Sequence, residues 1–182
     1  MKCALSLMAV LLVAAMVATA QGHDKYAQES LRGLKEVSLL IEGLEPRTAV
    51  LGLNKSAIQA DVELGLRQAG IKVLTGAESR AVPDAAMLHI KANMREGHGA
   101  AAEIFSCSLD VRLIQRVRLE RDPGIAHLFA STWSAESGVE ATGGGPGNVS
   151  VTSRIARGDA VGRVVRQVVD QFINAWLLVN PK

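Results

Sequence analysis

The chain has 182 residues, of which 48% are hydrophobic and only 3% aromatic, and its 20 Lys and Arg residues nearly balance its 18 Asp and Glu residues. This composition argues against nucleic-acid binding and extended carbohydrate binding, because those surfaces need a basic excess or rings on which bases and sugars stack. The length suits one domain that buries its core without disulfides or metal ions.

The first twenty residues, MKCALSLMAVLLVAAMVATA, have the pattern of a cleaved secretory signal peptide. Lys2 precedes an uncharged run from Ala4 to Ala20, and the small residues Ala18 and Ala20 end it as a signal peptidase site requires. Spanning a bilayer takes about 20 apolar residues, so the pattern favours a signal peptide over a retained membrane helix. The sequence therefore predicts export, cleavage before Gln21 and no transmembrane helix in the mature chain.

The positions of the two cysteines indicate where the exported protein is located and whether it is lipid-anchored. Cys3 precedes the apolar run, whereas a lipidated cysteine directly follows one, so we expect no lipid anchor. Cys107 is then the single cysteine after cleavage, which excludes an intramolecular disulfide. Small secreted proteins of animal type usually depend on such bridges. The pattern favours a bacterial protein that is periplasmic or secreted.

After the signal peptide, we expect residues 21–36 to form a polar lead-in and residues 37–182 to form a single domain. The domain opens with VSLLIEGL, residues 37–44, a short β-branched and apolar run that is typical of a strand. Pro46 closes that run.

A helix is predicted next, starting at Asn54 or Ser56 and ending at Gly70. Ser56 with Gln59 three residues later fits a capping box, and Gly70 suits a left-handed C-cap. Its apolar stripe consists of Ile58, Val62 and Leu66. A short strand, residues 71–74, follows, and strand–helix–strand with such short connections predicts a right-handed crossover.

The middle of the chain reads as antiparallel strands. A loop leads to residues 87–95, where apolar and polar side chains alternate strictly, as in a half-buried strand. The longest alternating run covers residues 104–121. Residues 122–124, Asp-Pro-Gly, predict a turn, and residues 127–137 then return as the hairpin partner.

The last part of the chain combines a loop and a helix. Residues 141–153 are rich in Gly, Ser and Thr and indicate a flexible loop, whereas residues 155–179 carry the strongest helical periodicity in the chain. Asp159 with Arg163 and Arg166 with Asp170 are spaced as ion pairs on successive turns.

These elements predict an α+β fold with the order β-α-β-β-β-β-α. We expect a two-layer sandwich: a mixed, mostly antiparallel sheet of about four to five strands, with both helices on one face. The other face would be open to water or to a partner.

No residue pattern indicates catalysis, a cofactor or a metal ion. The glycine-rich residues 143–147 lack the Lys and hydroxyl of a phosphate-binding loop, and no histidine or cysteine spacing matches a zinc site. Cys107 lies in the apolar stripe of its strand, which favours a buried, inert thiol. Asp110 and Glu120 are too far apart along one strand to act on one bond. A small extracytoplasmic enzyme using Cys107 or residues 143–147 remains the alternative.

The best candidate binding surface is the polar face of the antiparallel strands. Arginine is enriched at protein interfaces, so this face could dock an anionic or polypeptide partner; it could equally be ordinary solvated sheet, or join copies of the chain in a homo-oligomer. Trp133 belongs either to this surface or to the interior. The basic side chains of the face are Lys91, Arg95, Arg112, Arg116 and Arg118.

A signal peptide, a strand, a helix ending in LRQAGIKVL, alternating strands and a long closing helix together resemble small periplasmic α/β domains. The resemblance covers residues 37–179 and is to the TolB amino-terminal domain, the lipoprotein subunit of the lipopolysaccharide-assembly barrel and the curli-secretion lipoprotein. It implies an envelope protein that binds other proteins or envelope components without a reaction of its own. Many of these relatives are lipoproteins, whereas this chain lacks the lipidation cysteine.

Overall fold

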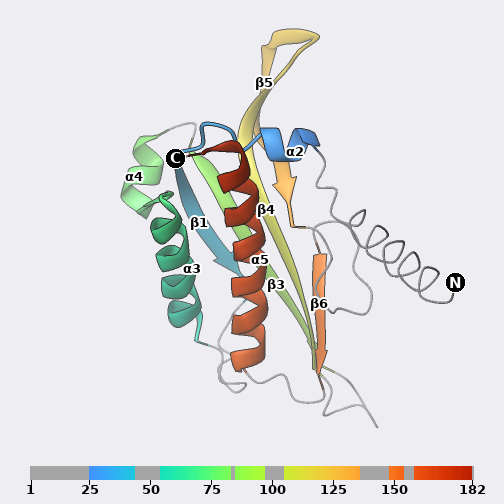
Figure 1. Ribbon diagram of the computed structural model, residues 1–182. Helices are drawn as coiled ribbons and strands as arrows, with labels where there is room; N and C mark the ends of the chain where they lie inside the picture. The colour runs from blue at the N-terminus through green and yellow to red at the C-terminus, as the bar shows by residue number, and fades with distance from the viewer. Residues whose placement is uncertain are drawn as a thin grey trace, which may run out of the picture.

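The computed structural model describes residues 25–43, 54–82, 85–96, 105–135, 148–153 and 158–181. Within these ranges the chain has an α+β fold, as predicted, in which helices cover one face of an open mixed sheet (Figure 1). Its elements in chain order are α2 (Lys25–Glu29), β1 (Glu36–Glu42), α3 (Lys55–Ala69), β2 (Lys72–Leu74), α4 (Gly76–Ala81), β3 (Ala86–Glu96), β4 (Phe105–Leu119), β5 (Asp122–Ser134), β6 (Asn148–Ser153) and α5 (Gly158–Val179).

The six-stranded sheet has the order β2-β1-β3-β4-β5, and β6 also pairs with β4. β1 runs parallel to both β2 and β3, whereas β4 runs antiparallel to β3, β5 and β6. β6 occupies the first half of one edge of β4 and β5 the second half, so that Asn148 lies opposite Asp110 and Ser134 opposite Arg112. β5 and β6 therefore act as one edge strand interrupted between residues 135 and 147.

α3 begins and ends where the sequence places its caps. The Asn54 side chain accepts a hydrogen bond from the Ala57 N–H at 3.1 Å, and Gly70 ends the helix with φ +101°. Asn54 is thus the N-cap and Ser56 lies inside the first turn, so the capping box predicted for Ser56 and Gln59 is wrong: the Gln59 side chain donates to the Glu63 carboxylate instead. The buried residues of α3 are those of the predicted stripe: Ile58, Val62 and Leu66.

The core fills the space between the sheet and the pair α3 and α5. Alternate residues of β1, β3 and β4 point toward the helices and are buried; they include Val37, Leu88, Ile90, Leu109, Val111 and Leu113. Trp133 of β5 belongs to this interior, where it packs edge-to-face on Phe172 of α5 with ring centroids 5.2 Å apart. The pairing of β5 with β4 has an irregular register, in which extra residues move the following side chains to the other face of the sheet. For this reason the alternation of polar and apolar residues in the β5 sequence does not show on which face Trp133 lies.

Three local features differ from the sequence-based expectations. Residues 148–153, predicted to belong to a loop, form β6 because β4 is long enough to pair with them beside β5. The hairpin turn lies at residues 120–121 rather than 122–124: Leu119 pairs with Asp122, and the Asp122 carboxylate accepts the Gly124 N–H at 3.0 Å inside β5. The predicted loop after β2 contains α4.

α4 is a short helix held by a capping box. The Thr75 hydroxyl accepts from the Glu78 N–H at 3.3 Å, and the Thr75 N–H donates to a Glu78 carboxylate oxygen at 2.8 Å. That backbone hydrogen bond holds the pKa of Glu78 below its ordinary value, and the Thr75 hydroxyl and Lys72 act in the same direction. The signal Thr75-x-x-Glu78 was present in the sequence, but no apolar stripe follows it.

The capping box predicts a pH dependence. Because the folded-state pKa of Glu78 is lowered, its carboxylate contributes stability above the pKa of the unfolded chain, and this contribution is lost as the pH falls through the folded-state value. We expect Glu78→Gln to be less stable than the wild type at pH 7. The difference should shrink as the pH falls below the ordinary glutamate value of 4.5. Urea unfolding at several pH values measures it, and a difference that grows toward acid would contradict the prediction.

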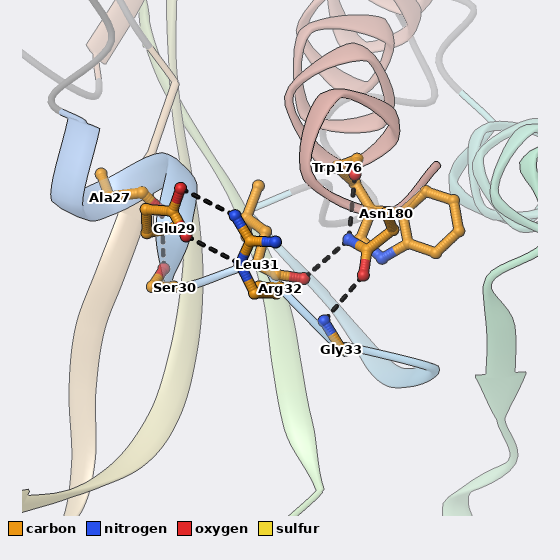
Figure 2. Close-up of polar contacts among 8 residues, drawn as sticks. All are labelled: Ala27, Glu29, Ser30, Leu31, Arg32, Gly33, Trp176 and Asn180. Carbon is orange, nitrogen blue, oxygen red and sulfur yellow. Dashed lines mark hydrogen bonds and ion pairs between the residues drawn. The ribbon is translucent and has the colours of Figure 1, made fainter. Parts of the chain in front are cut away.

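The lead-in predicted as residues 21–36 contributes to the packed structure from Lys25 onward. Leu31 is fully buried in the core, and Trp176 Nε1 of α5 donates to the Leu34 carbonyl at 2.7 Å. Asn180, directly after α5, accepts the Gly33 N–H at 2.7 Å and donates to the carbonyls of Leu31 and Trp176, each at 2.9 Å (Figure 2). We call this contact between residues 31–34 and the end of α5 the Asn180 clamp.

Candidate functional site

Two surfaces qualify as candidate sites by their exposed side chains, and both leave the helix layer uninvolved: the uncovered face of the sheet and a projecting hairpin. The face opposite α3 and α5 carries the alternate residues of the three central strands. In register across them, Leu40 lies beside His89 and then Arg112, and Glu42 lies beside Lys91 and then Asp110. We call this surface the open face.

The open face is balanced in charge. Arg112 Nε donates to the Asp110 carboxylate at 2.6 Å, and His89 Nε2 lies 2.9 Å from the Glu42 carboxylate. Lys91 is exposed between Glu42 and Asp110 in register. Because acidic neighbours accompany the basic groups, the strand face that the sequence suggested as basic has no cationic excess at Lys91 and Arg112.

The structure separates four of the five predicted site residues. Lys91 and Arg112 lie on the open face, but Arg116 and Arg118 lie farther along β4, past Ile114, which pairs with Met87 near the start of β3. The side chain of Arg95 lies outside the described residues. The predicted surface is therefore divided between two regions, and no single patch contains all five residues.

The second region is the hairpin that β4 and β5 form beyond the sheet, residues 115–130, which we call the arm. β3 pairs with β4 only as far as Ile114, so the arm is a two-stranded ribbon that projects from the end of the sheet (Figure 1). Its exposed side chains include Arg116, Arg118 and Arg121, alongside Glu120 and Asp122 at its tip.

The arm also exposes apolar side chains. Phe129 is 74% exposed and Ile125 is 40% exposed, although both lie in a strand. A two-stranded ribbon has too little core of its own to bury them. Exposed aromatic and arginine side chains together are typical of protein interfaces. Sequence analysis identified Arg116 and Arg118 but missed Phe129, because the side-chain alternation is broken in β5.

The base of the arm is held by Ser30, the residue directly after α2. Gln115 Nε2 donates to Thr132 Oγ1 at 2.7 Å and to the Ser30 carbonyl at 3.1 Å, and the Ser30 hydroxyl donates to the Thr132 carbonyl at 3.3 Å. Ser30 lies next to Leu31 of the Asn180 clamp. The arm is therefore connected through Ser30 and Leu31 to the end of α5, which orients it relative to the domain.

The helix layer carries a depression on its outer side, between α3 and α5. Its volume is about 310 Å³, at the small end of the range for ligand pockets. Val62, Gly65 and Val169 line it, together with Leu64, which is 56% exposed.

Acidic groups line the same depression. Arg166 of α5 donates to the Asp61 carboxylate of α3 at 2.7 Å rather than forming the predicted pair with Asp170. Asp170 also lines the depression, and within the part of the chain that the structure describes it has no ion pair. The crossing of α3 and α5 explains the change of partner, because it places Asp61 beside Arg166.

The described residues contain neither a metal-binding cluster nor a membrane-spanning helix. They contain no group of three His, Cys, Asp or Glu side chains placed to hold a metal ion. The residues searched for a membrane span also contain no helix that is long and apolar enough to cross a bilayer. The side chain of Cys107 and the glycine-rich residues 143–147 lie outside the described residues. An inert thiol with a loop that binds no phosphate, and the alternative of a small enzyme that uses either of them, therefore both stay predictions.

Comparison with known proteins does not show a family. No protein-family model matches the chain, and no curated protein matches it. Among solved structures, the chain is similar to a minor lipoprotein from Acinetobacter baumannii, with 11% sequence identity over 78% of this chain and 95% of that chain and a TM-score of 0.29. A similarity at this TM-score supports no argument about function. The resemblance to TolB-type periplasmic domains stays a prediction.

Proposed function

We propose that this chain is an exported, non-enzymatic binding or assembly domain of the bacterial envelope, and that it binds its partner through the arm. The observation that carries the proposal is the arm itself: a ribbon that exposes Phe129 and three arginines beyond the end of the sheet. Exposing an aromatic side chain costs solvation free energy, and burial against a partner would recover it. Export follows from the signal peptide pattern of residues 1–20.

The sheet edges support binding through side chains rather than by addition of a strand. β2 has three residues, and β5 carries Pro123 and three register irregularities. Short strands, prolines and bulges protect edges against pairing with another chain. A partner would therefore bind the exposed side chains of the arm and would not add a strand to the sheet.

Partner chemistry follows from the residues of the arm. Its three arginines and two carboxylates give the arm a net charge of +1. Each basic residue near an anionic bilayer contributes about 1 kcal/mol of attraction, so this net charge is too small to hold the arm on a membrane. A protein surface with an apolar depression and acidic side chains complements it better. We therefore propose a protein partner, without a cofactor or metal ion.

Photo-cross-linking in intact cells tests the proposal. A photoreactive amino acid at Phe129 should yield discrete adducts in the extracytoplasmic fraction, where the mature chain should begin at Gln21. The matched control is Leu178 on α5, which has the same exposed fraction, 74%. We expect adducts at Phe129 and few or none at Leu178. Equal yields at both sites, or retention of the full precursor in the cytoplasm, would contradict the proposal.

A further inference from the structure

We propose that the partner of the arm is a second copy of this chain, and that the arm of one copy docks in the depression between α3 and α5 of the next. This inference rests on the arm being a binding element, as proposed above, and identifies what it binds. It replaces the open face as the surface for homo-oligomerisation, because the charges of the open face are balanced and Arg112 and His89 already contact carboxylates of the same face.

The two surfaces match in size and in apolar character. The depression of about 310 Å³ lies at the small end of the range for ligand pockets and is large enough for one aromatic side chain. Phe129 is the most exposed aromatic residue on the arm, and Leu64 is exposed at the depression. Burying Phe129 against the exposed side chain of Leu64 would remove apolar surface from water on both copies, above a floor formed by the buried Val62 and Val169.

The two surfaces also match in charge. Asp170 in the depression forms no ion pair with any residue that the structure describes, since Arg166 is engaged with Asp61. On the arm, Arg118 and Arg121 are exposed and make no ion pair within the described ranges. Arginine is suited to carboxylate recognition at an interface, because its planar guanidinium can donate two parallel hydrogen bonds.

The arm and the depression of one molecule cannot meet. The arm continues the line of β4 and β5 past the end of the sheet, away from α3 and the middle of α5 (Figure 1). The contact must therefore join different copies, and it joins two different surfaces. Such a head-to-tail contact repeats from copy to copy, forming a ring if the rotation closes and an open chain otherwise.

Self-association of the purified mature chain is the first measurement. We expect sedimentation velocity to show oligomers that grow with concentration up to about 1 mM, as for a small interface. Phe129→Ala should raise the concentration of half-association at least about tenfold, which corresponds to 1.4 kcal/mol. Arg118→Glu with Arg121→Glu, and separately Asp170→Lys, should abolish association. Arg80→Glu, an exposed charge change on α4, is the matched control and should associate as the wild type does.

Mixing the variants identifies the head-to-tail arrangement. The Arg118→Glu, Arg121→Glu variant keeps its depression, and the Asp170→Lys variant keeps its arm. A mixture of the two should associate, although neither associates alone, because the unchanged arm of one variant meets the unchanged depression of the other. A symmetric contact between two arms would leave the Asp170→Lys variant able to associate alone, and a contact between two depressions would leave the arginine variant able to do so. Either result, or a mixture that stays monomeric, would overturn the proposal.

Two further outcomes would also overturn it: a wild type that stays monomeric across the whole concentration range, or oligomers that persist in both charge variants while circular dichroism shows them folded. These failures are distinguishable from failure of the proposed function. A monomeric chain that still forms arm-specific cross-links in cells binds a different protein, whereas a self-associating chain that is not exported would contradict only the envelope role.

Discussion

Gly43→Ala should destabilise the domain by about 2–5 kcal/mol, because two costs coincide at this residue. Gly43 follows β1 with φ +78°, a left-handed conformation that a side chain disfavours. A Cβ added there would overlap the carbonyl oxygen of Ala92 in β3 and lie 2.8 Å from its carbonyl carbon. Backbone of a central strand cannot move aside as a flexible side chain can. Urea and thermal unfolding measure the loss.

Gly33→Ala is the matched control for this substitution. Gly33 has nearly the same backbone angle, φ +74°, but a Cβ there would have no atom within 4 Å. It should therefore cost only the conformational term, about 1–2 kcal/mol. If the two variants lose the same stability, the close approach of β1 and β3 at Gly43 contributes nothing and the prediction is wrong.

Asn180→Ala should remove the Asn180 clamp and lower the free energy of unfolding by about 2–3 kcal/mol. The substitution loses three hydrogen bonds and leaves the Gly33 N–H and the Leu31 carbonyl without this partner. Each lost bond is worth about 0.5–1.5 kcal/mol, and in a domain of this size 1 kcal/mol corresponds to roughly 2–4 °C in Tm. Hydrogen exchange should also accelerate in residues 25–34.

Two variants locate the cause of this loss. Asn174→Ala removes the same side chain from an exposed position of α5, and it should be neutral or slightly stabilising because alanine is the better helix former. Asn180→Asp keeps the acceptor for the Gly33 N–H but turns a carboxylate oxygen toward the carbonyls of Leu31 and Trp176 at the end of α5, so it should be no more stable than Asn180→Ala. A loss in Asn180→Ala no larger than that in Asn174→Ala would contradict the structural role of the clamp.

The clamp also affects the arm, because Ser30 holds Gln115 and Leu31 is held by Asn180. Loosening residues 25–34 should therefore reorient the arm. Ser30, Leu31 and Asn180 thus all contribute to the orientation of the candidate site, although they lie far from the arm in the sequence.

The candidate site was only partly predictable. Arg116 and Arg118 were identified from alternation along β4, but so were Lys91 and Arg112, which the structure places among acidic neighbours on the open face. Alternation reports which side of a strand a residue occupies. It does not report how far the pairing with the neighbouring strand extends, and the pairing of β3 with β4 stops at Ile114, opposite Met87 near the start of β3.

Local interactions explain what the sequence alone determined. The caps of α3, the stripe of α5, the alternation of β3 and the α+β class depend on periodicity and on contacts between residues a few positions apart, and the structure confirms them. Only the tertiary structure decided that residues 148–153 pair with β4, that Arg166 binds Asp61 and that Trp133 lies inside. It also decided that the arm projects past the sheet with Phe129 exposed. Each of these four features depends on contacts between segments that are far apart in the sequence. Such contacts produce no periodic pattern within the sequence of either segment, so the sequence alone could not predict them.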